Sequence, residues 1–290
     1  MKKFLILSGL SLLSFFICSL FFLNSNFKSK FNSEYFSDSK NFSFSKSFTM
    51  GNDVVVKTEK KILELENINK IKIDAKTASL KIKSEEDLKD KAVFNIKNYS
   101  ESSKHSLTTE DDLIVLTLDN IGEDYSMNKS SEVEILLPKN TKNIDLSVVV
   151  TFGEVSLKNL NLHDLDVDIA AGSFSGKGLK LNEAFLEVSA GEVKLTKTFF
   201  NHLNSSVEGG SAEVEVLNPA PNAKVVTSAG QIKFKVGKGL VKNFNLNAKT
   251  SFGSTNLDEG YTENSDGSYT YGKGEGEVIL KADLGEINVL

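Results

Sequence analysis

The 290-residue chain contains no arginine and no tryptophan, and it has only one cysteine, three prolines and three histidines. Arginine supplies the planar fork that grips phosphate and base edges, so its absence removes the usual means of reading nucleic acid. The formal net charge of -5 also disfavours a polyanion. The single cysteine, Cys18, excludes an intramolecular disulfide and a cysteine-based metal cage. We therefore expect no nucleic-acid binding, and stability that comes from packing and backbone pairing.

The N-terminus combines a short basic patch with a long apolar run. Lys2 and Lys3 precede residues 4–23, which are apolar or small. That length spans a bilayer as a helix, and no small-residue cleavage pattern follows it. Residues 1–23 are therefore predicted to be an uncleaved signal anchor, with a cleaved signal peptide as the alternative. The lysines favour a cytoplasmic N-terminus, which places the bulk of the chain outside the cytoplasm, at the cell surface or in the periplasm.

Cys18 raises the alternative of a lipid-modified N-terminus. Bacterial lipoproteins carry small residues just before the acylated cysteine, whereas this chain has Phe15, Phe16 and Ile17 there. We expect Cys18 to fill volume in the apolar helix.

Residues 24–50 are predicted to be a linker rich in serine, lysine and phenylalanine. Phe27, Phe31 and Tyr35 recur every four residues, as on an interfacial helix, while the phenylalanines at 42, 44 and 48 alternate with polar residues as in a strand. A first strand that pads the following domain is favoured over membrane binding.

The rest of the chain, residues 51–290, is dominated by an internal repeat. The phrase "EVSAGEVKLTK" at 187–197 returns in several variants, each centred on one glycine. The seven glycines lie 19, 19, 19, 20, 23 and 32 residues apart and are Gly153, Gly172, Gly191, Gly210, Gly230, Gly253 and Gly285. The regular repeats occupy residues 143–290.

The flanks of these glycines alternate between polar and apolar residues. Around Gly191, for example, Val188 and Val193 are apolar while Glu192 and Lys194 are charged. Period-two alternation on both sides indicates two short strands, each with one buried face, joined at a corner where glycine adopts a positive φ. One such unit cannot cover its own apolar face, but stacked copies bury a continuous core. The predicted fold is therefore all-β: a single-domain parallel β-solenoid (β-helix) with coils of about 19 residues, preceded by the N-terminal transmembrane helix.

Two further features extend this prediction. "INKIKIDAKTASLKIKS" matches a degenerate coil in which Ala78 replaces glycine, and residues 91–99, 111–118 and 131–138 are predicted to be longer, less regular strands. In the last interval, Asp266-Gly267 predicts a tight hairpin turn flanked by Tyr261, Tyr269 and Tyr271, the candidate contact residues.

Several of these stretches resemble a known family, the bacterial putative-adhesin domains of unknown function, which are related to the GIN head domains of cell-surface proteins. The carriers are "EILLPKNTKNIDLSVVVTFGEV", "SAGEVKL", "SAGQIKF", "TSFGSTNL" and "GEGEVILKADLGEINV", and the resemblance covers about residues 60–290. It implies an extracytoplasmic, non-catalytic β-solenoid, often tethered to a membrane. The acidic residue expected after the glycine is a serine at 173, 211 and 254, so no continuous acidic ladder is expected.

No stretch carries a convincing catalytic or cofactor motif. "GSFSG" at 172–176 has Phe174 where a nucleophile elbow needs serine, and "GKGEGE" at 272–277 lacks dinucleotide-binding spacing. We expect no enzyme activity and no cofactor. The three histidines, His105, His163 and His202, are expected to be ordinary surface residues.

One cluster invites a metal interpretation. "NLHDLDVDIA" places His163, Asp164, Asp166 and Asp168 together, and the last two share an outward face that could hold calcium. The repeats of calcium-binding β-rolls are missing, and a solvent-facing strand explains the pattern, so we expect no metal.

The sequence thus favours a binding or structural module of a bacterial cell envelope, with an unidentified envelope protein or glycan as partner. One alternative is a scaffold that polymerises end to end, because "EINVL" closes the chain in a strand without an obvious cap. Another is a polysaccharide-acting β-helix enzyme, which is disfavoured by the absence of arginine and of a carboxylate cluster. Self-association into a homo-oligomer is left open.

Overall fold

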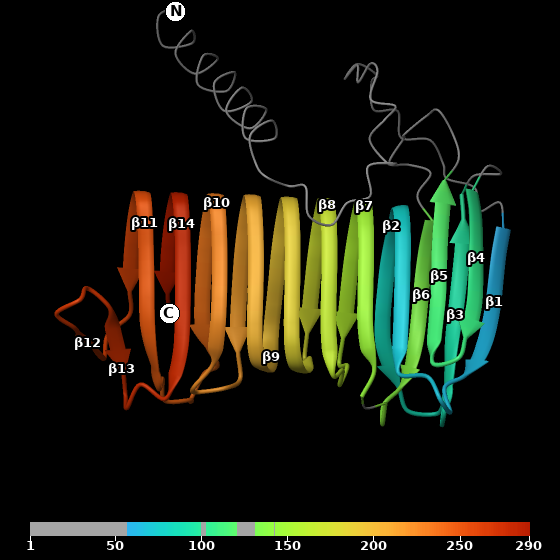
Figure 1. Cartoon of the computed structure of the whole chain (residues 1–290), viewed down its shortest axis with the longest axis horizontal. Coiled ribbons are helices and arrows are strands. Elements are labelled where there is room, and N and C mark those ends of the chain that lie inside the picture. Colours follow the sequence, from blue (N-terminus) through green and yellow to red (C-terminus); the bar gives the residue numbers. More distant parts are fainter. Residues whose placement is uncertain (1–56, 100–102, 121–130, 142) are drawn as a thin grey trace, which may run out of the picture. The chain divides into compact units, whose positions relative to one another are not determined.

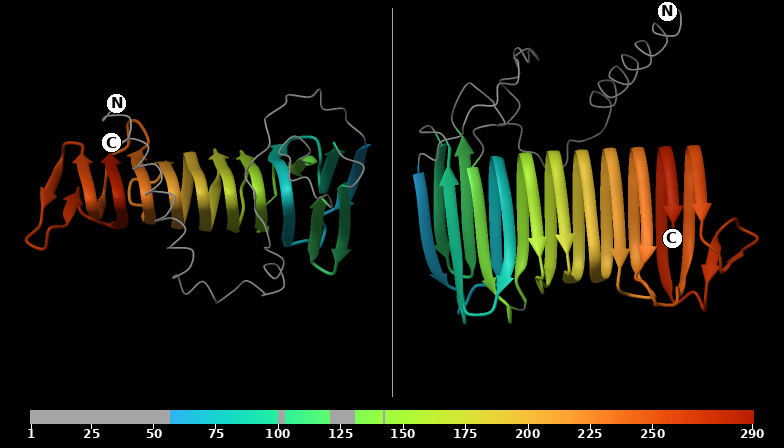
Figure 2. Two further views of the ribbon diagram at one scale, coloured as in Figure 1. Left: turned by 90° about the horizontal axis from the view of Figure 1, so that it is seen from above. Right: turned by 180° about the vertical axis from the view of Figure 1, so that it is seen from behind.

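The computed structural model describes residues 57–99, 103–120, 131–141 and 143–290, and every regular element among them is a β-strand. Residues Met50–Leu290 form one compact unit. The strands lie side by side in a long row that runs from β1 to the β12–β13 hairpin (Figures 1 and 2). Together they make one 14-stranded sheet. The all-β prediction is confirmed.

The strands of the regular region are long because each one runs through a glycine corner. They are β7 (Asp145–Lys158), β8 (Asp164–Lys177), β9 (Lys180–Val216), β10 (Asn222–Val236), β11 (Phe244–Leu257) and β14 (Gly276–Val289). β9 contains two corners, Gly191 and Gly210. In β7 the buried residues switch register at Gly153, from Leu146, Val148 and Val150 to Val155 and Leu157. The two arms of each coil therefore both face the core.

Parallel pairing stacks these coils with the glycines in register. Gly153 pairs with Gly172 and Gly172 with Gly191, and β2 (Lys70–Glu85) places Ala78 opposite Gly153. The degenerate coil predicted around Ala78 is thus confirmed. The inward side chains of successive coils form one continuous hydrophobic core. Stacking at about 4.8 Å satisfies the backbone groups between neighbours.

The stacking order departs from the sequence order at the C-terminal end. β14 pairs with β10 on one side and with β11 on the other, so Gly285 lies between Gly230 and Gly253. The expectation that "EINVL" forms an uncapped end is wrong, because the C-terminal strand is paired on both sides. Leu280 and Ile287 of β14 are fully buried, whereas β11 has smaller or more polar residues at the paired positions. Since Ala248 and Thr255 of β11 are the partners of Leu280 and Ile287, β14 is the more apolar of the two strands, and it gains more from the inner place.

The N-terminal end of the stack is closed by antiparallel strands. These are β1 (Lys57–Glu64), β3 (Lys91–Asn98), β4 (Ser103–Glu110), β5 (Leu113–Asn120) and β6 (Ser131–Pro138). The first half of β2 pairs with β5, which in turn pairs with β4. The second half of β2 pairs with β6, which in turn pairs with β3. The predicted strands at 91–99, 111–118 and 131–138 are confirmed, while β1 and β4 add two strands that the sequence did not reveal.

His105 connects the two halves of this end. Its Nε2 lies 3.0 Å from Glu59 Oε2 and its Nδ1 lies 3.2 Å from Asn98 Nδ2, with only 7% of the side chain exposed. The prediction of a surface histidine is wrong at this position, because β4 folds over the end of the core. Hydrogen bonds from Lys57 and Lys61, with a smaller contribution from His105, lower the pKa of Glu59 to about 2.

The tyrosine hairpin covers part of the C-terminal end of the stack, beside the start of β11. β12 (Tyr261–Glu263) and β13 (Tyr269–Tyr271) pair antiparallel, and β13 pairs with Phe244–Leu246 of β11. The predicted turn is confirmed: Gly267 has φ 77°, and the Ser268 amide donates to Asp266 Oδ1 at 3.0 Å. No helix among the described residues has the length and apolarity needed to cross a bilayer. The predicted anchor and linker lie outside those residues.

Candidate functional site

Three successive coils have a second corner, opposite the glycine corner, at which the backbone again adopts positive φ. Asn159, Gly178 and Lys197 have φ values of 55°, 65° and 51°, and they follow one another at the 19-residue repeat. Asparagine and glycine tolerate this conformation better than most residues. Because these three positions do not share one residue type, the sequence pattern did not reveal this second series of corners.

Four residues follow each of these turns in a shared pattern: "NLHD" at 161–164, "KLNE" at 180–183 and "FFNH" at 199–202. The second position points inward, so Leu162 and Leu181 are 4% and 3% exposed. The first and third positions point outward on either side. Backbone hydrogen bonds lock the coils together here, for example from the Asn182 amide to the His163 carbonyl at 2.9 Å.

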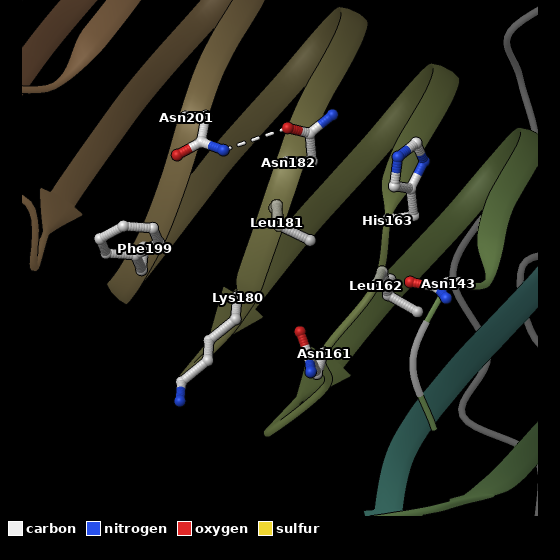
Figure 3. A pocket seen from close by; sticks show the side chains of 9 residues that line it. All are labelled: Asn143, Asn161, Leu162, His163, Lys180, Leu181, Asn182, Phe199 and Asn201. Carbon is white, nitrogen blue, oxygen red and sulfur yellow. Dashed lines mark hydrogen bonds between the residues drawn. The ribbon is translucent and has the colours of Figure 1, made fainter. Parts of the chain in front are cut away.

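This pattern builds an open groove along the second corner, which we call the corner groove. Its volume is about 300 Å³, at the lower end of the range for small-ligand sites. Figure 3 shows Leu162 and Leu181 between two rows of side chains. One row contains Asn161, Lys180 and Phe199 and the other contains His163, Asn182 and Asn201, while Asn143 lines the end of the groove beside Leu162.

The polar side chains of the groove are partly ordered by one another. Asn201 Nδ2 donates to Asn182 Oδ1 at 3.1 Å, and Asn182 Nδ2 donates to Asp164 Oδ1 at 3.4 Å. Phe199 is 40% exposed. The groove therefore offers amide donors and acceptors, one cation and one accessible aromatic ring beside an apolar floor.

The predicted aspartate cluster divides into two parts. His163 Nδ1 lies 3.1 Å from Asp145 Oδ1 and 3.3 Å from Asp164 Oδ1. Asp166 and Asp168 lie further along β8, on its outward face. Asp145 was not predicted to belong to this cluster, because it lies 19 residues before Asp164 in the sequence. The repeat length, applied to this part of the coil, would have placed it beside His163.

Asp168 belongs instead to a half-buried acidic group on the outward face. Burial, with smaller contributions from Glu187 and Asp166, raises the pKa of Asp168 to about 6. Burial and Glu187 also raise the pKa of Glu208. Asp168 and Glu187 are direct neighbours on adjacent coils. None of these carboxylates lines the corner groove.

The predicted contact tyrosines differ in accessibility. Tyr271 is only 1% exposed, and its hydroxyl donates to the Asp258 carbonyl at 3.2 Å, so it packs in the core instead of offering a contact surface. Burial raises its pKa to about 12. Tyr261 is 41% exposed and Tyr269 is half-buried, so a contact role for these two stays a prediction.

The stacked glycines and parallel coils define the class of protein, an all-β, solenoid-like repeat fold. The chain belongs to the Toastrack DUF4097 family, whose model matches residues 49–290. The resemblance to adhesin-type domains of unknown function is confirmed at this level. A comparison with curated proteins found no match.

Three solved structures of bacterial proteins align with most of the chain. A putative cell adhesion protein from Clostridium sporogenes has 18% identity and a TM-score of 0.38, with 80% of this chain and 98% of that chain covered. A putative adhesin from Bacteroides fragilis has 12% identity and a TM-score of 0.39, with 81% and 98% covered. A putative lipid binding protein from Parabacteroides distasonis has 12% identity and a TM-score of 0.27, with 80% and 96% covered.

Proposed function

We propose that the protein is a non-catalytic binding module of the bacterial cell envelope, an adhesin-type domain whose corner groove binds a glycan. In this proposal residues 4–23 anchor the chain in the membrane and the solenoid lies outside the cytoplasm. The single observation that carries the proposal is the composition of the groove. It combines amide side chains in a row, a partly exposed ring and an apolar floor.

These groups match the chemistry of a sugar. Each asparagine amide both donates and accepts hydrogen bonds, as a pair of neighbouring sugar hydroxyls does. The partly exposed ring of Phe199 suits the C–H face of a pyranose, while Leu162 and Leu181 close the bottom of the groove. Because the outward positions repeat with every coil, Asn182 and Asn201 present the same group at a spacing of about 4.8 Å, close to the length of one sugar residue.

The lining of the groove supports binding over catalysis. Its side chains are asparagines, leucines, one phenylalanine, one lysine and one histidine, so no pair of carboxylates lies in it. Glycoside hydrolysis ordinarily needs two carboxyl groups on opposite sides of the bond. The carboxyls with raised pKa, Asp168 and Glu208, are outside the groove.

A glycan array probed with the full chain in mild detergent tests this proposal. We expect saturable binding to a defined set of glycans, without release of shorter products. Phe199→Ala and Asn182→Ala should weaken binding by about tenfold each, which corresponds to about 1.4 kcal/mol. The matched control is Phe185→Ala, because Phe185 is 49% exposed on the strand face and does not line the groove.

Equal loss in the Phe185 and Phe199 variants, or binding that both groove variants retain, would contradict the groove assignment. Cleavage of an oligosaccharide would instead support the enzymatic alternative. Binding of an envelope protein in place of any glycan would overturn the choice of ligand.

The scaffold alternative has one supporting observation, at β11. Among the described residues, the outer side of Asn247–Leu257 pairs with no strand. The opposite end is closed by antiparallel strands, and its two edge strands, β1 and β4, carry lysines that discourage strand pairing: Lys57, Lys60, Lys61 and Lys104. One open end allows two chains to pair but does not let a polymer grow, so we expect at most dimers. Filaments seen by light scattering would instead favour the scaffold alternative.

A further inference from the structure

A cluster of three ligand-type side chains lies beside the corner groove, at the start of β7 and β8. His163 Nδ1 faces two carboxylate oxygens, Asp145 Oδ1 at 3.1 Å and Asp164 Oδ1 at 3.3 Å. The three side chains come from two successive coils. All are accessible to solvent, with 51%, 41% and 39% of the His163, Asp145 and Asp164 side chains exposed.

The charge of this cluster is not balanced by lysine. Several acidic side chains of the solenoid pair with lysines on adjacent strands, as Glu213 does with Lys194 at 2.7 Å and Glu132 with Lys81 at 3.1 Å. Within the described ranges, the only ion-pair partner of Asp145 and Asp164 is His163. One imidazole nitrogen carries at most one proton, so it cannot donate a full hydrogen bond to both carboxylates at once. This geometry suits a cation better than a proton.

We propose that Asp145, His163 and Asp164 bind a divalent transition-metal ion of the zinc type. Zinc takes imidazole nitrogen at about 2.0–2.1 Å and carboxylate oxygen at about 2.0–2.2 Å in tetrahedral geometry, which separates neighbouring ligand atoms by roughly 3.3–3.5 Å. The two observed separations lie at or just below this range. The three ligand atoms all lie within 4.8 Å of one another, so side-chain rotations that bring the two carboxylates together would create the site and leave the fourth position for water or an external ligand.

The surrounding structure holds these ligands in place. The Asp145 amide donates to the Asn69 carbonyl at 2.8 Å and the His163 amide donates to the Ile144 carbonyl at 3.0 Å, so the backbone of both ligands is tied to adjacent coils. Asn182 Nδ2 donates to Asp164 Oδ1 at 3.4 Å. Partners of this kind orient metal ligands and strengthen binding. Zinc is favoured over calcium because calcium prefers six to eight oxygen ligands.

The test is equilibrium binding of zinc alone to the full chain in mild detergent, with no glycan present. We expect one zinc ion per chain to bind saturably. His163→Gln and Asp145→Asn should each weaken the affinity by at least tenfold. The matched control is His202→Gln, which removes an exposed histidine at the same corner two coils further on and should leave zinc affinity unchanged.

Cobalt provides a second readout, since tetrahedral Co²⁺ absorbs visible light strongly and an octahedral aqueous ion does not. The cobalt spectrum should appear with the parent chain and disappear in the His163→Gln variant. Absence of saturable zinc binding, or binding that His163→Gln leaves intact, would overturn the assignment. The experiment contains no glycan, so its failure leaves the proposed glycan site standing and its success does not depend on that site.

Discussion

At the scale of single residues, the glycine corners are the most constrained positions in the chain. A Cβ atom added to Gly191 would lie 1.6 Å from the Gly172 carbonyl oxygen, and φ at Gly191 is +144°. The space that a side chain would need is filled by the backbone of the preceding coil, which cannot move without breaking the stack. Positive φ and close approach therefore act together at the same position.

The adjacent pair Gly209-Gly210 allows a direct test of this constraint. In Gly210→Ala the new methyl group would lie 1.8 Å from the Gly191 carbonyl oxygen, whereas in Gly209→Ala the nearest atom, the Ser189 carbonyl oxygen, is 3.7 Å away. We expect Gly210→Ala to lower the free energy of unfolding by about 3 kcal/mol or more and Gly209→Ala to change it by less than about 0.5 kcal/mol. Urea unfolding measures both. Similar midpoints for the two variants would refute the role given to the corner glycines.

Asp168 gives a pH-dependent prediction. Its pKa of about 6 in the folded protein lies above the ordinary value of 3.8, so its ionisation opposes folding. Its contribution to stability is fully present below about pH 3.8 and is lost as the pH rises through 6. We therefore expect Asp168→Asn to raise the thermal midpoint at pH 8, with a smaller gain at pH 4. The control is Glu192→Gln, because Glu192 is exposed and directly follows the corner glycine Gly191. We expect this variant to leave the thermal midpoint nearly unchanged at both pH values. A gain at Asp168 that is larger at pH 4 than at pH 8 would contradict the sign.

At the scale of elements, the two ends of the solenoid are closed by different devices. Antiparallel strands and the buried His105 close one end, while the β12–β13 hairpin covers part of the other. Tyr271 lies 5.1 Å from the Phe244 ring and Phe244 lies 6.0 Å from the Phe234 ring, measured between centroids. The hairpin is therefore part of the core at this end, and only its outer side is open to solvent.

Truncation of the tyrosines should separate these two roles. Tyr271→Ala removes a fully buried ring, so we expect the free energy of unfolding to fall by about 3–5 kcal/mol. Tyr261→Ala removes a ring that is 41% exposed, and the loss should stay within about 1 kcal/mol. Thermal unfolding distinguishes the two, and an equal loss would show that the hairpin does not cap the core as the structure indicates.

Elements were predictable from the sequence where local pattern and burial agree. The arms of β7, β8 and β9 were predicted from the 19-residue spacing of the glycines and from the alternation of polar and apolar residues around them, because this alternation shows which face of a strand is buried. β1 and β4 were not predicted, because their many charged and polar residues obscure the alternation. They also pair with antiparallel partners that the local sequence pattern does not specify. The contact between Asp145 and His163 was not predicted for a related reason, because the two residues become neighbours only when the coils stack.

At the scale of the whole molecule, the position of β14 sets the order of assembly at the C-terminal end. β11 is separated from β10 by the last strand of the chain, so β11 can reach its native place only when β14 is present. In a solenoid each coil contacts only its neighbours, and loss of one coil removes the support of the next.

A chain that ends at Gly274, and so lacks β14, tests this order. We expect the backbone amides of Phe244–Leu257 to lose protection from hydrogen exchange, while those of β7 and β8 keep it, because their own neighbours remain. Protection of β11 in the shortened chain would mean that β11 can dock directly on β10.

The sequence by itself determined the repeat, its length, the corner glycines and the inward and outward faces of each arm. These follow from side-chain periodicity and from backbone conformations that glycine adopts most readily. The tertiary structure decided the order of the last two coils, the burial of His105 and Tyr271, the corner groove and the meeting of Asp145 with His163 and Asp164. Those features depend on contacts between coils, which arise from stacking and are not encoded within any one repeat.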